Sequence, residues 1–216
     1  MPESLPDILY EKMGNIPCVD SPNSMYQIPF YKDGDYFESI ESRVTFVNQC
    51  EKLIRSNDRY SKYKKYLINV VGLDHSQVIP GCTVTESSRE MMIEMHHGPI
   101  FTLFDITDII VEYFLLKKWK ITTYRIADYV LEEHYKNRIQ IVMLDPSSHQ
   151  EVHDRSIFIN CKQAFGDIVG FIKKHREAIS EMYMEKLENY IERSKKYDSN
   201  DFGVFELNNA IYPSNY

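Results

Sequence analysis

Apolar positions recur at helical spacing through most of the chain. A helix is predicted from about Tyr36 to Ser56 because four apolar positions lie three or four residues apart: Val44, Val47, Cys50 and Ile54. The same spacing predicts a helix over 59–71, through Tyr60, Tyr63, Leu67 and Val71. It also favours helices at 103–118, 123–136, 163–175 and 177–196.

Two short segments have the pattern of strands. Residues 90–96 form an apolar run that ends before Gly98-Pro99, and Arg138 to Leu144 is rich in β-branched and apolar residues. Residues 72–82 read as a loop. Thr122 or Thr123 is a suitable N-cap for the helix at 123–136, and Ser147 or Ser148 could cap a helix after the second strand.

These elements predict an α+β protein that is mostly helical. Residues 1–35 hold seven Pro and Gly residues and are expected to form an irregular acidic arm. Residues 36–200 are expected to form a single helical domain, and 201–216 a loose tail. With 43% hydrophobic residues, the chain can fill a core.

The net charge of −7 is unevenly distributed. Residues 1–51 hold nine acidic and three basic residues, whereas basic residues concentrate at 52–82, 117–138 and 155–176. Such bands could form a phosphate-binding face, and solvated helix surface is the alternative. The abundance of Tyr, Ile, Lys and Asn favours a phage or an AT-rich bacterium as the source.

Cysteine spacing and hydropathy favour a cytoplasmic protein. The four cysteines lie far apart without a C-x-x-C pair, so neither a disulfide framework nor a cysteine zinc knuckle is predicted. No apolar run approaches the roughly 18 residues of a membrane helix, and the N-terminus has no secretion-signal pattern.

Three of the seven histidines have the spacing of metal ligands. His149 and His153 are four residues apart, so both imidazoles lie on one helical face and can reach one ion. His96 ends the first predicted strand and could supply a third nitrogen, which leaves a coordination position open as in catalytic zinc sites. His97 should point away from His96, because neighbouring side chains alternate along a strand, and is thereby available as a base. The alternative is a set of ordinary polar histidines.

The surrounding residues resemble the HNH, or ββα-metal, nuclease superfamily, and most closely the colicin-type DNases. Those enzymes carry E-L-H-H before a proline, and this chain has Glu94-Met95-His96-His97-Gly98-Pro99. They then carry a strand followed by P-x-x-H-x-x-x-H, which corresponds to the block from Pro146 to His153. The resemblance covers about 20 residues in two blocks.

The resemblance implies a role for each matching residue. His96, His149 and His153 would bind a divalent ion, with zinc favoured by imidazole ligation and Mg²⁺, Mn²⁺ or Ni²⁺ able to support turnover. His97 would activate the water nucleophile. Glu94, two residues before His96, would orient a ligand or the base.

The chain departs from the family pattern in two ways. The finger, at about 88–156, would carry a two-helix insertion at 103–136 between its strands, where the family has a short loop. The family's middle Asn, which pins loop backbone near the base, corresponds to Gln140. The helix pair at 103–136 could read DNA, although most amphipathic helix pairs have this pattern.

Three functional hypotheses follow. The first is an HNH-type endonuclease that hydrolyses DNA, with Lys62–Lys65 and Lys117–Lys120 holding the phosphate backbone. The second is a catalytically degenerate HNH fold that binds nucleic acid or a protein, with the acidic arm as a possible partner contact. The third is an unrelated metallohydrolase or a helical interaction protein. The sequence leaves the oligomeric state open.

Overall fold

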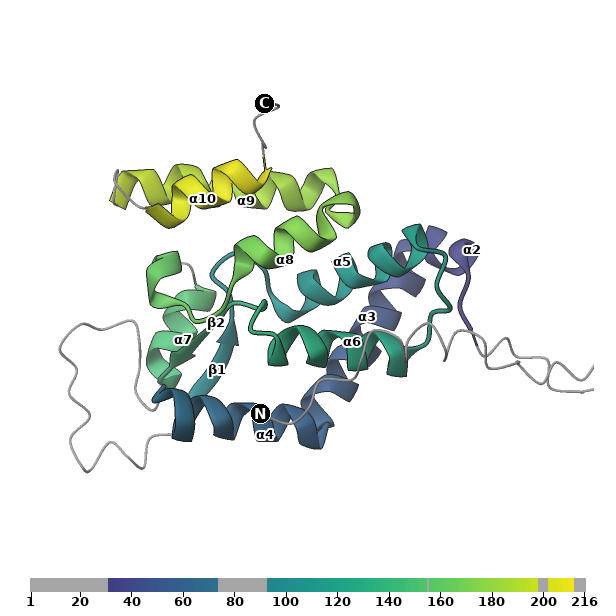
Figure 1. Ribbon diagram of the computed structural model, residues 1–216, viewed down its shortest axis with the longest axis horizontal. Helices are drawn as coiled ribbons and strands as arrows, with labels where there is room; N and C mark the ends of the chain where they lie inside the picture. The colour runs from purple at the N-terminus through teal and green to yellow at the C-terminus, as the bar shows by residue number, and fades with distance from the viewer. Residues whose placement is uncertain (1–30, 74–92, 155, 198–201, 212–216) are drawn as a thin grey trace, which may run out of the picture.

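A computed structural model describes residues 31–73, 93–154, 156–197 and 202–211 of the chain. Within these ranges the protein is mostly helical, with one small antiparallel sheet, as expected from the sequence (Figure 1). The predicted arm lies outside the described residues up to residue 30. The described end of the arm contacts the helical domain, since Lys32 N–H donates a hydrogen bond to the carbonyl of Ile121 at 2.9 Å.

The N-terminal part forms α2 (Gly34–Glu38), α3 (Ile40–Ser56) and α4 (Asp58–Tyr66), followed by a π-helical segment, η1 (Leu67–Val71). Asn57 ends α3, and its side chain accepts a hydrogen bond from the Arg59 N–H at the start of α4. The two predicted helical segments are confirmed, except that Ser39, in extended backbone, divides the first into α2 and α3 and that the second ends in the π-helical turn. Of the four apolar positions that predicted the first helix, Val44 is 40% exposed, whereas Val47, Cys50 and Ile54 are buried together with Phe46.

Helices α5 (Leu103–Leu116) and α6 (Thr123–Tyr135) form the centre of the core. Thr102 and Asp105 make a reciprocal capping box at the start of α5, and Thr122 caps α6. Both helices pack against α3 and against each other. Since most of their residues are buried, this pair is core structure and does not present a free face that could read DNA.

The sheet pairs two segments that are far apart in the sequence. Strand β1 (Glu94–His97) runs antiparallel to β2 (Ile141–Leu144), with His96 opposite Val142. Helix α7 (Pro146–His153) contacts both strands. Strand β2 is shorter than the predicted 138–144, whereas residues 90–92 of the other predicted strand and most of the predicted loop at 72–82 lie outside the described residues. The predicted serine cap is wrong: Asp145 caps α7, with Pro146 at its first position.

A C-terminal layer of α8 (Ile168–His175), α9 (Glu181–Tyr197) and α10 (Phe202–Ile211) lies over α5 (Figure 1). Short 3-10 helices at Cys161–Gln163 and Arg176–Ala178 precede α8 and α9. Because α10 is helical, the predicted loose tail at 201–216 is wrong over 202–211. Leu207, Ala210 and Ile211 are buried, and α10 contacts α8 and α9. Tertiary packing thus stabilises α10, although the local sequence only weakly favours a helix there.

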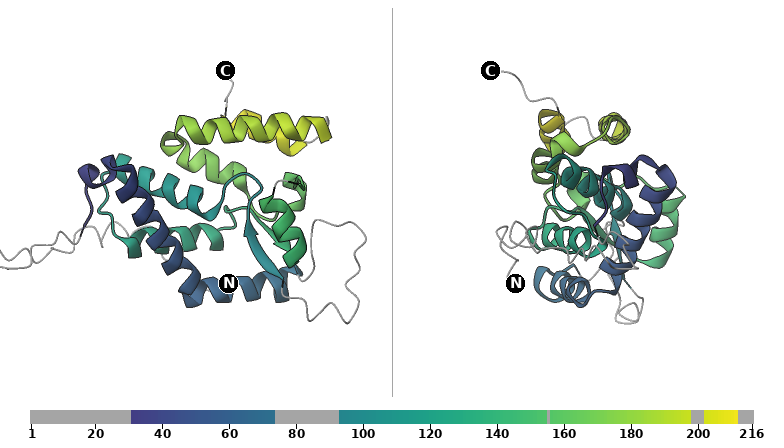
Figure 2. Two further views of the ribbon diagram at one scale, coloured as in Figure 1. Left: turned by 180° about the vertical axis from the view of Figure 1, so that it is seen from behind. Right: turned by 90° about the vertical axis from the view of Figure 1, so that its right-hand side faces the viewer.

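The sheet and α7 lie at one end of the molecule, near α4 (Figure 2). None of the described helices is long and apolar enough to cross a membrane.

A buried histidine in the core makes stability depend on pH. Burial lowers the pKa of His175 to about 4, because its ring is enclosed, and the hydrogen bond from Nδ1 to the Phe171 carbonyl (3.0 Å) only partly opposes this shift. The unfolded chain therefore binds a proton at this ring between about pH 6.5 and about pH 4, where the folded protein does not. Stability must consequently fall as the pH falls through this window.

We expect His175 to remove about 2 kcal/mol of unfolding free energy between about pH 7.5 and about pH 5. Urea unfolding in chelator at both pH values measures the loss. The unfolding free energy of a His175→Gln variant should fall by correspondingly less over the same pH interval. An equal pH dependence for the two proteins would show that His175 does not titrate in this way.

Candidate metal centre

Three imidazoles converge where β1 meets α7. His96 comes from β1, and His149 and His153 come from successive turns of α7. One ligand atom from each lies within 4.8 Å of the other two. His149 Nε2 and His153 Nε2 are 3.1 Å apart. The structure thus brings together the three residues that the sequence predicted as ligands.

The donor set fits a divalent ion. Two nitrogens that each lie roughly 2.0–2.1 Å from a tetrahedral zinc are about 3.3 Å apart, close to the separation of His149 Nε2 and His153 Nε2. Burial, with His149 and His153 nearby, lowers the pKa of His96 to about 4. A ring that stays neutral keeps a lone pair for a metal. His153 is exposed, so an ion held here would remain accessible from outside.

Glu94 orients one of the three rings. Its carboxylate contacts Nδ1 of His149, which leaves Nε2 of that ring facing the other histidines. A carboxylate on the outer nitrogen fixes both the tautomer and the orientation of a metal-binding histidine. Glu94 and His96 lie on one face of β1, as their spacing of two residues predicts. The structure therefore places Glu94 where the sequence analysis expected a supporting carboxylate.

Replacing Glu94 with glutamine should weaken zinc binding roughly 10- to 100-fold, the usual cost of losing such an outer partner. The fold should be unaffected, since the Glu94 side chain is 40% exposed. Competition with a zinc-binding dye measures the affinity. Glu151→Gln on the exposed side of α7 is the control. Equal zinc affinity in Glu94→Gln and wild type would show that Glu94 does not support zinc binding.

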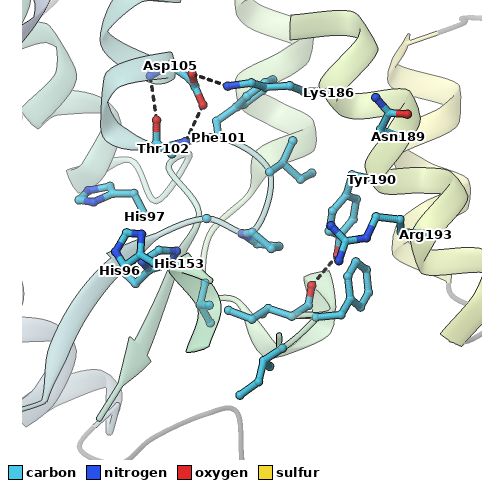
Figure 3. A pocket seen from close by; sticks show the side chains of 17 residues that line it. His96, His97, Phe101, Thr102, Asp105, His153, Lys186, Asn189, Tyr190 and Arg193 are labelled. Carbon is cyan, nitrogen blue, oxygen red and sulfur yellow. Dashed lines mark hydrogen bonds and ion pairs between the residues drawn. The ribbon is translucent and has the colours of Figure 1, made fainter. Parts of the chain in front are cut away.

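His97 lies on the opposite face of β1 from His96, as alternation along a strand predicts. Its side chain is buried, and Nε2 lies 3.0 Å from Nε2 of His134 on α6. Tyr60 stacks on the ring at 6.2 Å. Figure 3 shows the His97 ring turned away from His96 and His153. His97 nevertheless lines the cavity beside the histidine cluster.

Hydrogen bonding fixes the tautomer of His97. His134 Nδ1 lies 2.8 Å from the carbonyl of Val130, which can only accept, so the His134 proton is on Nδ1. Its Nε2 then accepts, and the His97 Nε2–H must donate to it. The lone pair of His97 is consequently on Nδ1. Burial and the neighbouring His134 also lower the pKa of His97 well below its usual range, so the ring is neutral at neutral pH.

Gln140 contributes through its backbone and not through its amide. The side chain is buried, with its Oε1 4.0 Å from the Cys161 sulfur. Its carbonyl accepts a hydrogen bond from Gly98 N–H at 3.3 Å, which holds the chain just after His97. A Cβ on Gly98 would lie 3.1 Å from His96 Nε2, so a larger residue at this position would press against the His96 ring.

A cavity of about 400 Å³ opens beside the cluster, between β1, α7 and α9. His96, His97 and His153 line one side (Figure 3). The other side is formed by α9 side chains that the sequence analysis missed: Lys186, Asn189 and Arg193. Their i, i+3, i+7 spacing signals a shared helical face, but only the packing of α9 shows what that face opposes.

The two basic segments that the sequence suggested for DNA binding, Lys62–Lys65 and Lys117–Lys120, lie at different distances from the cavity. Lys117 pairs with Glu177, and the Lys120 ammonium lies over the ring of Tyr31 at 4.6 Å. Both follow the far end of α5, about 20 Å of helix from the cavity. Lys62 and Lys65 lie exposed on α4, which is closer to the sheet end of the molecule (Figure 2).

The fold and the cluster define a mostly helical protein with a three-histidine centre on a two-stranded sheet and a helix. A family model for the bacteriophage G278-like virion proteins matches residues 15–211. The chain therefore belongs to that family, which agrees with the phage origin favoured by its composition. No curated protein and no solved structure matches the chain.

Proposed function

We propose that this phage virion protein is a metal-dependent endonuclease of the HNH type that hydrolyses DNA. The observation that carries the proposal is the convergence of His96, His149 and His153 at the edge of a cavity with a basic opposite wall. Three imidazoles with an accessible open side are the ligand pattern of a catalytic centre, since structural zinc sites use four protein ligands. The order of β1, β2 and α7 supports the HNH assignment.

Each residue has a defined task in this proposal. A divalent ion, when bound, supplies Lewis acidity toward the phosphate and the departing 3′ oxygen. His96, His149 and His153 hold the ion, and Glu94 keeps the His149 ring in place. His97 takes the proton of the attacking water on Nδ1, while His134 holds Nε2 and thereby the tautomer. The backbone of Gln140 holds the chain beside the base.

A second candidate is a catalytically degenerate form of the same centre. Here the ion would stabilise the β1–β2–α7 unit of a virion component that binds nucleic acid or a protein partner. The burial of His97 against His134 favours this candidate, because a base must reach the attacking water. The acidic segment before α3 is then the first region to test for a protein contact.

Metal-dependent nicking of supercoiled plasmid separates the two candidates. Chelator-treated protein should leave the plasmid intact, and one or more of Mg²⁺, Mn²⁺, Ni²⁺ or Zn²⁺ should restore nicking. Bound metal without nicking under any of these ions would favour the degenerate centre. Failure to bind any of the ions would contradict both candidates.

A further inference from the structure

One wall of the cavity has no role in holding the ion. Lys186, Asn189 and Arg193 project from α9 toward the cavity that His96 and His153 line on the other side (Figure 3). The two sets of side chains come from separate parts of the fold. A ligand in this cavity would therefore touch both the histidine cluster and α9.

The three wall residues differ in how they are held. Lys186 forms an ion pair of 2.7 Å with Asp105 in the first turn of α5, which neutralises its charge. The Arg193 guanidinium lies over the ring of Phe158 at 5.1 Å. Among the described residues, no carboxylate lies within ion-pair distance of Arg193. Arg193 is thus the side chain of this wall whose charge is available to a ligand.

The platform beneath Arg193 is fixed in place. Phe158 stacks on Tyr190 with ring centroids 5.4 Å apart and planes at 24°. The Tyr190 hydroxyl donates to the carbonyl of Ile159 at 3.1 Å. A guanidinium supported on an aromatic face loses little freedom on binding and can direct its donors outward.

The chemistry of this wall suits a phosphate. Guanidinium groups bind phosphate oxygens through two parallel hydrogen bonds, and an Asn amide is a frequent additional donor to nucleic-acid backbone. Because the histidine cluster would hold the phosphate that is cleaved, the wall can serve a different phosphate of the same strand. A single strand that crosses the cavity could contact both sides.

We propose that Arg193, assisted by Asn189, binds a second phosphate of the nucleic-acid strand whose scissile phosphate lies at the histidine cluster. This inference rests on the proposed function for its substrate class. It adds residues that neither the metal centre nor the HNH resemblance requires. Arg193 is a positioning residue in this scheme, since it binds the strand away from the reacting atoms.

Binding of a fluorescein-labelled DNA duplex to the full chain in chelator tests the proposal without cleavage. Arg193→Ala should weaken binding roughly five- to tenfold at moderate salt and reduce the slope of log K against log salt by about 0.9, the contribution of one phosphate contact. Arg193→Lys should keep the slope but bind DNA more weakly, because lysine retains the positive charge and loses the paired hydrogen bonds of the guanidinium. Circular dichroism checks that the variants are folded.

Lys195→Ala is the matched control, since Lys195 lies on the same helix about 200° around from Arg193. It should bind nearly as wild type. A series of duplexes with one neutral methylphosphonate each should identify a position that weakens wild type but not Arg193→Ala. Equal affinity and salt slope for Arg193→Ala and wild type would overturn the proposal, as would an absence of DNA binding by wild type.

The outcomes separate this inference from the proposed function. Nicking by wild type together with unchanged binding by Arg193→Ala would retain the nuclease and overturn the phosphate contact. Binding that depends on Arg193 without nicking under any ion would retain the contact and count against the nuclease.

Discussion

Replacing His153 with alanine is expected to remove the bound divalent ion and DNA cleavage together. His153 and His149 contribute two of the three imidazoles, and their Nε2 atoms are 3.1 Å apart. Loss of a direct ligand should cost more than the roughly 10- to 100-fold in affinity that an outer partner contributes. Because His153 is exposed at the end of α7, the fold should be retained.

Metal analysis of the purified variant after dialysis measures the ion content, and plasmid nicking measures the activity. Gln150→Ala is the control, since this residue is exposed on the same helix and its amide contacts only Asp154 among the described residues. The control should keep both the ion and nicking. Undiminished metal content in His153→Ala would show that the ion is bound elsewhere.

Replacing His97 should separate the two effects: the ion stays bound, and cleavage is lost. A positioned general base contributes roughly two to four powers of ten in rate, so His97→Ala should lose about this much. Metal content and DNA affinity should change little, because His97 faces away from the ligands. A nicking time course beside metal analysis measures both quantities.

The buried position of His97 requires a second variant. Alanine would leave His134 Nε2 without its donor, at a cost of about 1–3 kcal/mol in stability. His97→Gln can still donate an amide N–H to His134 but cannot act as the base. It should fold more stably than His97→Ala and be as inactive. Nicking at the wild-type rate by His97→Gln would eliminate His97 as the base.

Most of the features that the sequence predicted correctly depend only on the spacing of residues along one helix or one strand. The i, i+4 pair His149 and His153 needs only a helix to share a face, and Asp145-Pro146 begins that helix. Glu94 and His96 need only a strand. The match to known motifs then indicated that the two segments meet, which their pairing in the sheet bears out.

Contacts between distant elements could not be predicted from the sequence, because they depend on how the helices pack. Nothing near His134 in the sequence indicates that it contacts His97, because the contact requires α6 to pack behind β1. Arg193 faces the cavity only because α9 docks beside it. The helix α10 has Gly203 and two adjacent Asn residues in a short segment, and its burial against α8 and α9 outweighs their weak helix propensity.

The proposed nuclease activity is tested most directly by cleavage of end-labelled DNA by wild-type protein in molar excess, with each divalent ion restored after chelation. We expect scission that depends on the added ion and leaves 3′-hydroxyl and 5′-phosphate ends, because the 3′ oxygen departs. Ligation of the products and gel mobility identify these ends. Intact DNA under every ion, with metal bound to the protein, would show that the three-histidine centre is not a nuclease site.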